Sequence, residues 1–459
     1  MCGVFGIRSP DRDVARIAYF GLFALQHRGQ ESAGIAVSDR GRITALREMG
    51  LVTQVFSEEK LKGLRGELAI GHTRYSTTGS THWANAQPVV HNGHARTVAL
   101  GHNGNLTNAA ELREELAERG VRVHSTSDSE MIAALIAHDD APLEEAIAHT
   151  IRKLDGAFSC VALAENRLIA FRDPRGMRPL CLGRIGDDWI AASETCALDL
   201  VGADFVREIG LGEAVLIDEA GVTSLQAAAP DGGGALCIFE FFYLARPDSR
   251  LAGVEVHSAR VRMGQRLAEE APVEADLVLP IPDSGTPAAI GFSRASGIPF
   301  SEGLIKNRYV GRTFIQPEQG LREQGIRLKF NPLAEVAGQR VVVIDDSIVR
   351  GNTTRQIVRM LFDAGASEVH VRISSPPVIG PCFYGIDLAD EDELVAARRS
   401  VEAVRSYIGA SSLHYLSLDG LQAATLRPES ELCRACLTRE YPTRVPVEAA
   451  KLRFEPIPS

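Results

Sequence analysis

The segment at residues 341–354 places the strongest constraint on the fold. It begins with four branched apolar residues, Val341–Ile344, which are followed by the acidic pair Asp345-Asp346. A continuous apolar run of this kind predicts a strand buried on both faces, as in parallel sheets covered by helices. The two carboxylates then emerge at the carboxyl end of the strand, where open parallel sheets bind their ligands. A ligand site is therefore predicted at this sheet edge.

Two further segments extend the pattern. Asp276–Pro280 and Glu368–Ser374 are also largely apolar, and an amphipathic helix ending near Gly365 separates the second of them from the run at Val341. Alternation of strand, loop and helix is typical of an α/β unit. We therefore predict an open parallel sheet in the second half of the chain, with functional loops at the carboxyl ends of its strands.

The residues after the acidic pair have the chemistry of a phosphate site. Gly351-Asn352-Thr353-Thr354 supplies backbone N–H groups and two hydroxyls at a predicted helix N-terminus. Asp345 and Asp346 are suited to accept hydrogen bonds from vicinal ribose hydroxyls or to hold Mg²⁺ with its waters. The alternative to a ligand site is a capped helix after a buried strand. It would explain Thr353 and Thr354 but not the adjacent acids Asp345 and Asp346.

A polar stretch upstream, residues 306–329, is predicted to form a lid over this site. Its three glycines suit a segment that closes over an anionic ligand and excludes water, and a solvated loop is the alternative. Ser284, in the loop Pro282–Thr286 after the first strand, is a candidate neighbour of Mg²⁺. The basic side chains of the stretch are Lys306, Arg308, Arg312, Arg322, Arg327 and Lys329.

Composition and charge narrow the class of protein. A chain of 459 residues is too long for one core, and the Gly-rich seam at residues 227–234 divides it near the middle. The sequence contains no apolar run long enough for a transmembrane helix, and because charged residues interrupt its start we expect no signal peptide. The spacing of its eight cysteines favours a reducing cytoplasm. A net charge of −10 argues against binding to nucleic acid or an anionic membrane, so an anionic substrate needs a local basic patch.

The half before the seam is predicted to be an α+β unit with antiparallel sheet. Short apolar runs predict its strands, and patterns of helical period interrupt them. The strands are predicted at Ser32–Val37, Leu68–Ile70, Ala157–Leu163 and Arg167–Arg172, and the helices at residues 109–119 and 129–138.

Cys2 carries a candidate nucleophile. Removal of Met1 would leave a cysteine with both a thiol and a free α-amine, whose ordinary pKa values are about 8.5 and about 7.7–8.0. The amine is then able to take the thiol proton near neutral pH, directly or through a water, and to activate the sulfur. An ordinary cysteine after a start codon is the alternative.

Two charged residues of the first half are suited to hold an amino acid. Arg74 follows an apolar strand, where its guanidinium can grip a carboxylate with two parallel hydrogen bonds; a surface ion pair is the alternative. Asp128 opens a helix and can hold an ammonium group. Its alternative is to favour the helix N-terminus, beside a capping box of Ser127 and Glu130.

A third segment contains Asn103-Gly104. The pair is foremost a signal for a hairpin turn, and His91-Asn92-Gly93 repeats the same triplet as His102-Asn103-Gly104. The same pair can also present a side-chain amide and a backbone N–H to a developing oxyanion.

In their order along the chain, these segments resemble the glutaminase domain of the N-terminal-nucleophile (class II) amidotransferases. The resemblance rests on Cys-Gly-Val-Phe-Gly at the start, Gln-His-Arg-Gly-Gln-Glu, His-Thr-Arg-Tyr-Ser-Thr and His-Asn-Gly-Asn-Leu-Thr-Asn. It implies a four-layer αββα fold. It also implies Cys2 as nucleophile, Asn103 and Gly104 in the oxyanion hole, and Arg74, Asp128 and Arg28 for binding glutamine.

The segment at residues 341–354 resembles the phosphoribosyl-pyrophosphate (PRPP) motif of type I phosphoribosyltransferases. One departure is Asn352, where many members carry threonine. The resemblance implies Mg²⁺ near Ser284, Asp345 and Asp346. It also implies a set of residues that bind PRPP: Asp345, Asp346, Ser347, Arg350, Gly351, Asn352, Thr353, Thr354, Lys306 and Lys329.

Four further cysteines form a possible ligand set. Cys433 and Cys436 make a C-x-x-C near the end of the chain, and Cys237 and Cys382 complete four thiolates. Such a set suits Zn²⁺ or a [4Fe–4S] cluster. The surrounding strings resemble the iron–sulfur branch of the glutamine PRPP amidotransferases, which favours the cluster. The remaining cysteines, Cys160, Cys181 and Cys196, are expected to be inert core residues.

The resemblance covers nearly the whole chain and implies the amidophosphoribosyltransferase reaction. Glutamine, PRPP and water give phosphoribosylamine, glutamate and pyrophosphate, in the entry step of de novo purine synthesis, with ammonia passing internally between the sites. It also implies feedback by purine nucleotides and a homotetramer. We predict a glutaminase domain at residues 2–230, and at residues 235–459 a phosphoribosyltransferase domain with a helical, cysteine-containing extension.

Two rivals share parts of this pattern. The class II enzyme that makes glucosamine 6-phosphate would need sugar-isomerase domains, which the segment from Asp345 to Thr354 contradicts. A PRPP-sensing regulator would lack chemistry, and Cys2 together with the basic stretch weighs against it.

Overall fold

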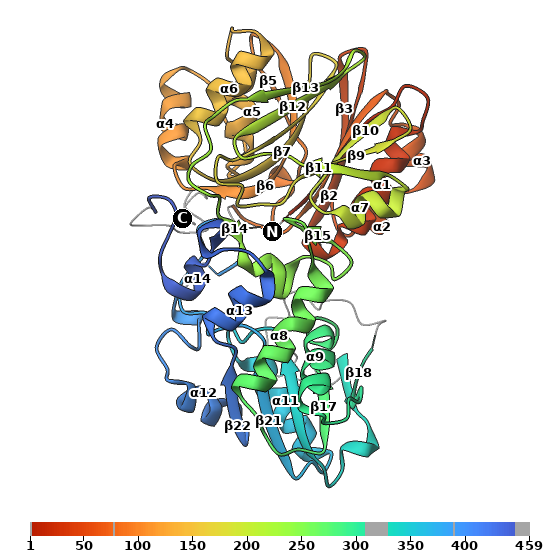
Figure 1. Ribbon diagram of the computed structural model, residues 1–459. Helices are drawn as coiled ribbons and strands as arrows, with labels where there is room; N and C mark the ends of the chain where they lie inside the picture. Colours follow the sequence, from red (N-terminus) through yellow and green to blue (C-terminus); the bar gives the residue numbers. More distant parts are fainter. Residues whose placement is uncertain (1, 77–78, 308–328, 389–390, 446–459) are drawn as a thin grey trace, which may run out of the picture.

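The computed structural model describes residues 2–76, 79–307, 329–388 and 391–445, and it contains two sheet-based halves (Figure 1). Two antiparallel sheets face each other in the first half, as Figure 1 shows. The first has the strand order β11-β9-β10-β1-β4-β2-β3, and the second β13-β12-β8-β7-β6-β5. In the first sheet the strands are β1 (Gly3–Arg8), β2 (Ser32–Asp39), β3 (Arg42–Met49), β4 (Leu68–Arg74), β9 (Cys181–Ile185), β10 (Asp188–Ala192) and β11 (Asp204–Glu208). In the second they are β5 (Val89–Asn92), β6 (Thr97–Leu106), β7 (Gly156–Ala164), β8 (Arg167–Arg172), β12 (Glu213–Asp218) and β13 (Gly221–Gln226).

Apolar side chains that alternate along the strands fill the space between these sheets. Val4 and Ile70 of the first sheet and Val161 and Leu168 of the second belong to one buried cluster. Helices cover the outer faces, as two further clusters show. The first sheet carries α1 (Val14–Ala24), α2 (Val52–Val55), α3 (Glu58–Lys62) and α7 (Thr195–Val201), and the second carries α4 (Ala109–Glu118), α5 (Ser129–Ala137) and α6 (Leu143–Lys153). The predicted αββα layers are confirmed.

The second half is built on a parallel sheet with the strand order β17-β20-β21-β22. Its strands are β17 (Leu277–Pro280), β20 (Arg340–Asp345), β21 (Glu368–Ile373) and β22 (Ser412–Tyr415). The helices α8 (Val256–Glu270) and α9 (Thr286–Ser296) share one buried cluster with Val342 and Ile344, and α11 (Asn352–Asp363) and α12 (Val401–Ile408) share another with Val341 and Val343. Because β20 is covered on both faces, its apolar run and the predicted open parallel sheet are confirmed.

Short elements connect the halves. β14 (Leu236–Cys237) pairs in parallel with β23 (Leu432–Cys433), close to α14 (Ala435–Thr438), and Figure 1 shows β14 and α14 at the level where the two halves meet. A π-helical segment, η3 (Glu240–Leu244), follows β14. The other short elements are the strands β15 (Arg250–Leu251), β16 (Val254–Glu255), β18 (Leu304–Lys306) and β19 (Phe330–Pro332), the helix α13 (Leu418–Thr425), and the 3₁₀ turns η1 (Gln26–Arg28), η2 (Trp83–Asn85), η4 (Ala334–Val336), η5 (Glu391–Glu393) and η6 (Glu429–Glu431).

Within the four described ranges, the longest apolar helical stretches fall short of what would be needed to cross a bilayer.

Candidate active site

Cys2 lies directly before β1, with only 6% of its surface exposed. Its backbone N–H donates to Oδ1 of Asn103 at 3.3 Å, and its Sγ donates to the carbonyl of Tyr75 at 3.7 Å. The other end of the Asn103 amide, Nδ2, is buried and has no hydrogen-bond partner among the described residues. A buried donor without a partner costs free energy unless a ligand satisfies it. This amide is therefore a candidate donor to an oxyanion formed beside Cys2.

Asn103 and Gly104 lie inside β6, so the alternative of a hairpin turn is wrong for this pair. They pair with Ser159 and Phe158 of β7. Gly104 has φ +155°, and a Cβ there would lie 1.9 Å from the carbonyl oxygen of Ala157. Only glycine fits this close approach of two backbones.

The related triplet at residues 91–93 does mark a turn. β5 ends at Asn92, and β6 begins at Thr97 and pairs with it in antiparallel register. The two identical triplets thus have different structures. The chain reverses direction after residues 91–93, whereas residues 102–104 lie inside a continuous strand.

Arg74 is the last residue of β4 and its side chain is almost completely buried. Its Nη1 lies 3.6 Å from a carboxylate oxygen of Glu31 and 3.2 Å from the carbonyl of Ser80. The alternative of a surface ion pair is therefore wrong. A buried guanidinium beside the Cys2 region has the chemistry to bind a carboxylate.

Asp128 is buried at the start of α5, where its Oδ2 accepts the N–H of Leu106 at 2.9 Å. Burial opposes ionisation, but nearby His102 and the backbone N–H groups outweigh it and lower the pKa of Asp128. The predicted capping box is absent: Glu130 instead accepts the backbone N–H groups of His124 and Ser125. Asp128 is therefore a buried carboxylate held in its charged form.

His102 is a residue of this region that the sequence did not single out. Its Nδ1 lies 3.6 Å from Oδ1 of Asp128, and although burial opposes the charge, this carboxylate raises the pKa of His102. Its position next to Asn103 in a strand could have identified it, because consecutive side chains of a strand point to opposite faces of the sheet. Asn103 thus contacts Cys2 while His102 contacts Asp128.

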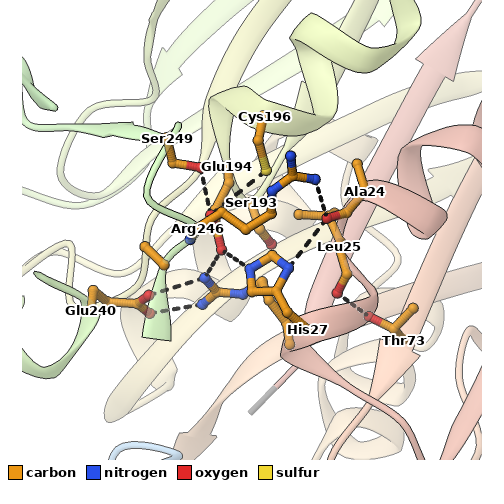
Figure 2. A network of polar contacts seen from close by, with 12 residues as sticks. Ala24, Leu25, His27, Thr73, Ser193, Glu194, Cys196, Glu240, Arg246 and Ser249 are labelled. Carbon is orange, nitrogen blue, oxygen red and sulfur yellow. Dashed lines mark hydrogen bonds and ion pairs between the residues drawn. The ribbon is translucent and has the colours of Figure 1, made fainter. Parts of the chain in front are cut away.

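Arg28 is buried completely and bonds to Glu194 and Glu240, two members of the network that Figure 2 shows. Its Nε donates to the carbonyl of Cys2 at 2.9 Å, its Nη1 lies 2.5 Å from Glu194, and its Nη2 lies 2.7 Å from Glu240. Burial opposes the positive charge, yet Glu240 and Glu194 raise the pKa of Arg28. With these partners, the guanidinium fixes the backbone of Cys2.

Glu194 is the centre of the network in Figure 2, where His27, Arg246 and Ser249 surround it. It accepts hydrogen bonds from His27 at 2.7 Å, from the backbone N–H of Arg246 at 2.9 Å and from Ser249 at 2.6 Å. Although burial opposes ionisation, His27 and Arg28 lower the pKa of Glu194. Glu194 and Glu240 carried no motif in the sequence.

The second candidate site lies where β20 ends. Asp345 and Asp346 are buried side by side; the N–H of Asp346 donates to Oδ1 of Asp345 at 2.9 Å, and the Ser347 hydroxyl donates to Asp346 at 2.6 Å. Burial raises the pKa of both carboxyls, for Asp345 with the further effect of the neighbouring Asp346. The side chain of Ser284 acts in the opposite direction and lowers the pKa of Asp346. This donor set fits a hard divalent cation, which would favour the charged form of both carboxyls.

The loop after Ser347 leads into α11. Gly351 has φ +77° and caps the helix that begins at Asn352. Asn352 accepts a hydrogen bond from the hydroxyl of Tyr407 at 2.7 Å, whereas Thr353 is exposed and Thr354 is buried. Backbone N–H groups at such a helix start suit a phosphate.

The remaining predicted PRPP ligands make contacts with other residues of the second half. Lys306 ends β18 with its Nζ 2.5 Å from Asp283, and the side chain of Arg350 forms an exposed ion pair with Glu393. The carbonyl of Lys329 accepts the N–H of Asn307. The rest of the predicted lid lies outside the described residues, including Arg308, Arg312, Arg322 and Arg327.

The structure brings the four candidate ligand cysteines together. Cys237 pairs directly with Cys433 in the ribbon β14–β23, and Cys436 follows in α14. Burial, and then the proximity of Cys237, Cys382 and Cys433, raises the pKa of Cys436 far above its ordinary value. Among the described residues, no three or more histidine, cysteine or acidic side chains are arranged as a closed metal site. The four thiols are nonetheless neighbours, since Cys382 packs against the buried clusters that contain Cys237, Cys433 and Cys436, and four cysteines are the donor set of a four-thiolate group.

The other three cysteines lie in the apolar core, as predicted. Cys160, Cys181 and Cys196 are buried, and burial raises the pKa of each thiol. Thiols held in the protonated form are poor nucleophiles.

Comparison with known families matches both halves. A model described as a glutamine amidotransferase domain covers residues 72–200, and one described as a phosphoribosyl transferase domain covers residues 259–374. Together with the fold, this defines the class: a glutamine amidotransferase joined to a phosphoribosyltransferase.

Relatives named amidophosphoribosyltransferase align along almost the entire chain. The protein from Mycobacterium bovis is 54% identical over 98% of this chain and 88% of its own length, and that from Archaeoglobus fulgidus is 49% identical over 98% and 99%. The solved structure of the glutamine PRPP amidotransferase from B. subtilis, complexed with ADP and GMP, superimposes with a TM-score of 0.92 at 45% identity, over 98% of this chain and 99% of that one. The chain belongs to the amidophosphoribosyltransferase family, a family of pentosyltransferases.

Proposed function

We propose that Cys2 is the nucleophile with which this chain performs the reaction of its family. In that reaction glutamine-derived ammonia is transferred to C1 of PRPP, giving phosphoribosylamine, glutamate and pyrophosphate in the first step of purine biosynthesis. The observation that carries the proposal is the buried Nδ2 of Asn103, which has no hydrogen-bond partner in the part of the chain that the structure describes. The Oδ1 of the same side chain accepts the Cys2 N–H, so the amide lies beside the nucleophile.

The first half then cleaves the side-chain amide of glutamine. After Met1 is removed, the α-amine takes the thiol proton and the sulfur attacks the amide carbon. Asn103 Nδ2 and the N–H of Gly104 donate to the oxyanion, which is the stage at which such donors contribute most. The carbon–nitrogen bond breaks, ammonia leaves with the proton, and water hydrolyses the thioester to glutamate.

Two buried charges orient the substrate in this proposal. Arg74 binds the α-carboxylate of glutamine, and Asp128 binds the α-ammonium, which its lowered pKa favours. Arg28 was predicted to bind glutamine as well. Its contacts with Glu194, Glu240 and the Cys2 carbonyl support a different role, which is to position the nucleophile.

The second half binds PRPP at the end of β20. Asp345 and Asp346 accept hydrogen bonds from the ribose hydroxyls, and residues 351–354 hold the 5-phosphate at the start of α11. Lys306, Lys329, Ser347 and Arg350 are proposed as the further ligands of PRPP. Mg²⁺ near Ser284 and the two aspartates would neutralise pyrophosphate as the C1–oxygen bond breaks. Ammonia attacks C1 of the ribose, and internal transfer between the sites stays a hypothesis.

Cys237, Cys382, Cys433 and Cys436 are proposed to hold a [4Fe–4S] cluster, with Zn²⁺ as the alternative. Their convergence supports a four-thiolate group, and thiolate ligands alone are compatible with both. Colour and iron content of anaerobically purified protein distinguish the two.

Regulation and assembly remain proposals that rest on the family. The B. subtilis relative was solved with ADP and GMP, which supports feedback by purine nucleotides. The homotetramer, the cytoplasmic location, and domain bounds of 2–230 and 235–459 stay predictions, as does the absence of nucleic-acid and membrane partners.

The experiment that tests the function measures PRPP-dependent release of glutamate. Cys2→Ala should abolish glutamine-dependent synthesis and retain ammonia-dependent synthesis, and the matched control Cys181→Ala, in the core, should retain both. Equal loss of both activities in Cys2→Ala would contradict the role of Cys2. A PRPP sensor would release no glutamate, and fully active protein that still carries Met1 would exclude activation by the α-amine.

A further inference from the structure

A segment of the second half, residues 382–387, lies against the candidate glutaminase site. β5 pairs with β6 only from Thr97 to Leu100. Beyond that point the Nδ2 of Asn105 donates to the carbonyl of Phe383 at 3.0 Å. Gly385 approaches so closely that a Cβ there would lie 3.0 Å from the carbonyl oxygen of Gly104. The segment therefore contacts the stretch of β6 that contains the oxyanion candidates.

The end of the same segment contacts Tyr75, which itself contacts Cys2. The hydroxyl of Tyr75 donates to Oδ2 of Asp387 at 3.1 Å, and the backbone carbonyl of Tyr75 accepts the Sγ of Cys2. Tyr75 also follows Arg74, the candidate ligand of the glutamine carboxylate. Asp387 is thus placed to fix the loop after β4.

The start of the segment is anchored in the cysteine cluster. Cys382 is one of the four candidate ligand cysteines, and its sulfur accepts the N–H of Tyr384 at 3.4 Å. The carbonyl of Tyr384 accepts two hydrogen bonds from the buried Arg178, at 2.9 Å and 2.5 Å. Arg178 also contacts Glu240 at 3.2 Å, and Glu240 bonds to Arg28, which holds the Cys2 carbonyl. Both ends of the segment are therefore linked to Cys2 through intermediate residues, Tyr75 at one end and the series Arg178, Glu240 and Arg28 at the other.

We propose that residues 382–387 form a strap that positions the glutaminase site and that the four cysteines fix its start. The strap holds β6 at Asn105 and the loop at Tyr75, so the donors beside Cys2 keep the geometry that an oxyanion requires. Such donors contribute only when surrounding contacts hold them in place. This inference rests on the proposed glutaminase function, and it makes Phe383, Gly385 and Asp387 positioning residues.

Two variants test the contacts of the strap without altering a cysteine. Tyr75→Phe removes the hydroxyl that bonds to Asp387, and Asn105→Ala removes the amide that bonds to Phe383. Each should lower kcat for glutamine hydrolysis about tenfold or more with little change in KM, because substrate contacts remain and transition-state donors are displaced. Ammonia-dependent synthesis and metal content should stay at the unmutated level. Tyr19→Phe, on α1, is the matched control and should change neither kcat nor KM.

A structural readout accompanies the kinetics. In Tyr75→Phe and Asn105→Ala, backbone amides at residues 102–106 should exchange with deuterium at least tenfold faster than in the unmutated holoprotein. Cys382→Ser should lower metal content and give the same faster exchange.

Each result decides between distinct failures. Unmutated protein that releases no glutamate would overturn the proposed function itself. Unmutated protein that hydrolyses glutamine, beside variants with unchanged kcat and unchanged exchange, would overturn the strap alone. If Cys382→Ser loses metal but exchange at residues 102–106 is unchanged, the claim that the four cysteines fix the start of the strap is overturned.

Discussion

Replacing Glu240 by glutamine should destabilise the folded chain by about 3–5 kcal/mol, the usual cost of removing one charge from a buried ion pair. Glu240 accepts two hydrogen bonds from Arg28, at 2.7 Å and 3.0 Å, and one from Arg178 at 3.2 Å. All three side chains are fully buried. Glutamine keeps the shape of glutamate but leaves the two guanidiniums without one of their compensating charges, and its amide N–H₂ faces donors.

Urea unfolding of Glu240→Gln, followed by fluorescence and circular dichroism, measures this cost. The matched control is Glu58→Gln, which breaks a bidentate pair with Arg16 of the same 2.7 Å geometry on the surface. Water and ions screen an exposed pair, so the control should unfold at nearly the same urea concentration as the unmutated chain. A loss below about 1 kcal/mol in Glu240→Gln would refute the reasoning, since it would mean that the buried charges are compensated elsewhere.

Three further predictions concern single residues. Gly104→Ala should abolish glutamate release, because its Cβ would lie 1.9 Å from the Ala157 carbonyl oxygen; an assay with ammonia as substrate should retain synthesis, and normal glutaminase activity would contradict the close approach. Burial lowers the pKa of His72 to about 3. Below about pH 6.5 the unfolded chain therefore binds a proton at His72 that the folded chain does not bind. The free energy of unfolding should then fall by up to about 1.4 kcal/mol per pH unit as the pH drops toward 3. His72→Gln should reduce this slope in unfolding experiments between pH 6.5 and 5, and an unchanged slope would mean that His72 takes up its proton in the folded state. Cys433→Ser should lower the metal content per chain, measured by elemental analysis, and full occupancy would exclude Cys433 as a ligand.

Much of the fold was predictable because its strands are buried in continuous or alternating runs. β8 spans Arg167–Arg172, the bounds predicted from the sequence, and the run at Val341–Ile344 forms the centre of β20. A strand that other layers cover needs apolar side chains at its own positions, so such a strand can be recognised from its own segment of sequence alone. The ends of the longer strands were missed where polar residues continue the ladder, as at Arg74 of β4.

The candidate site was predictable only where a residue lay in a local motif. Cys2, Asn103 and Asp345 did, but Glu240 is a single acid in an apolar stretch, and Arg178 has no distinctive neighbours. Their function depends on partners more than a hundred residues away in the chain, such as Arg28 for Glu240. No periodicity records a contact of that kind, because it is set by how the two halves pack.

The ribbon of β14 and β23 has a consequence for how the protein is made on the ribosome. Leu236–Cys237 leaves the exit tunnel nearly two hundred residues before Leu432–Cys433, its partner. Amino-terminal domains fold as synthesis proceeds, so the glutaminase sheets are able to form before the other three cysteines of the set, all of which follow Cys237, have been made. A nascent chain released before Cys436 therefore lacks the thiols that complete the set, and loading with metal would report that translation had passed this residue.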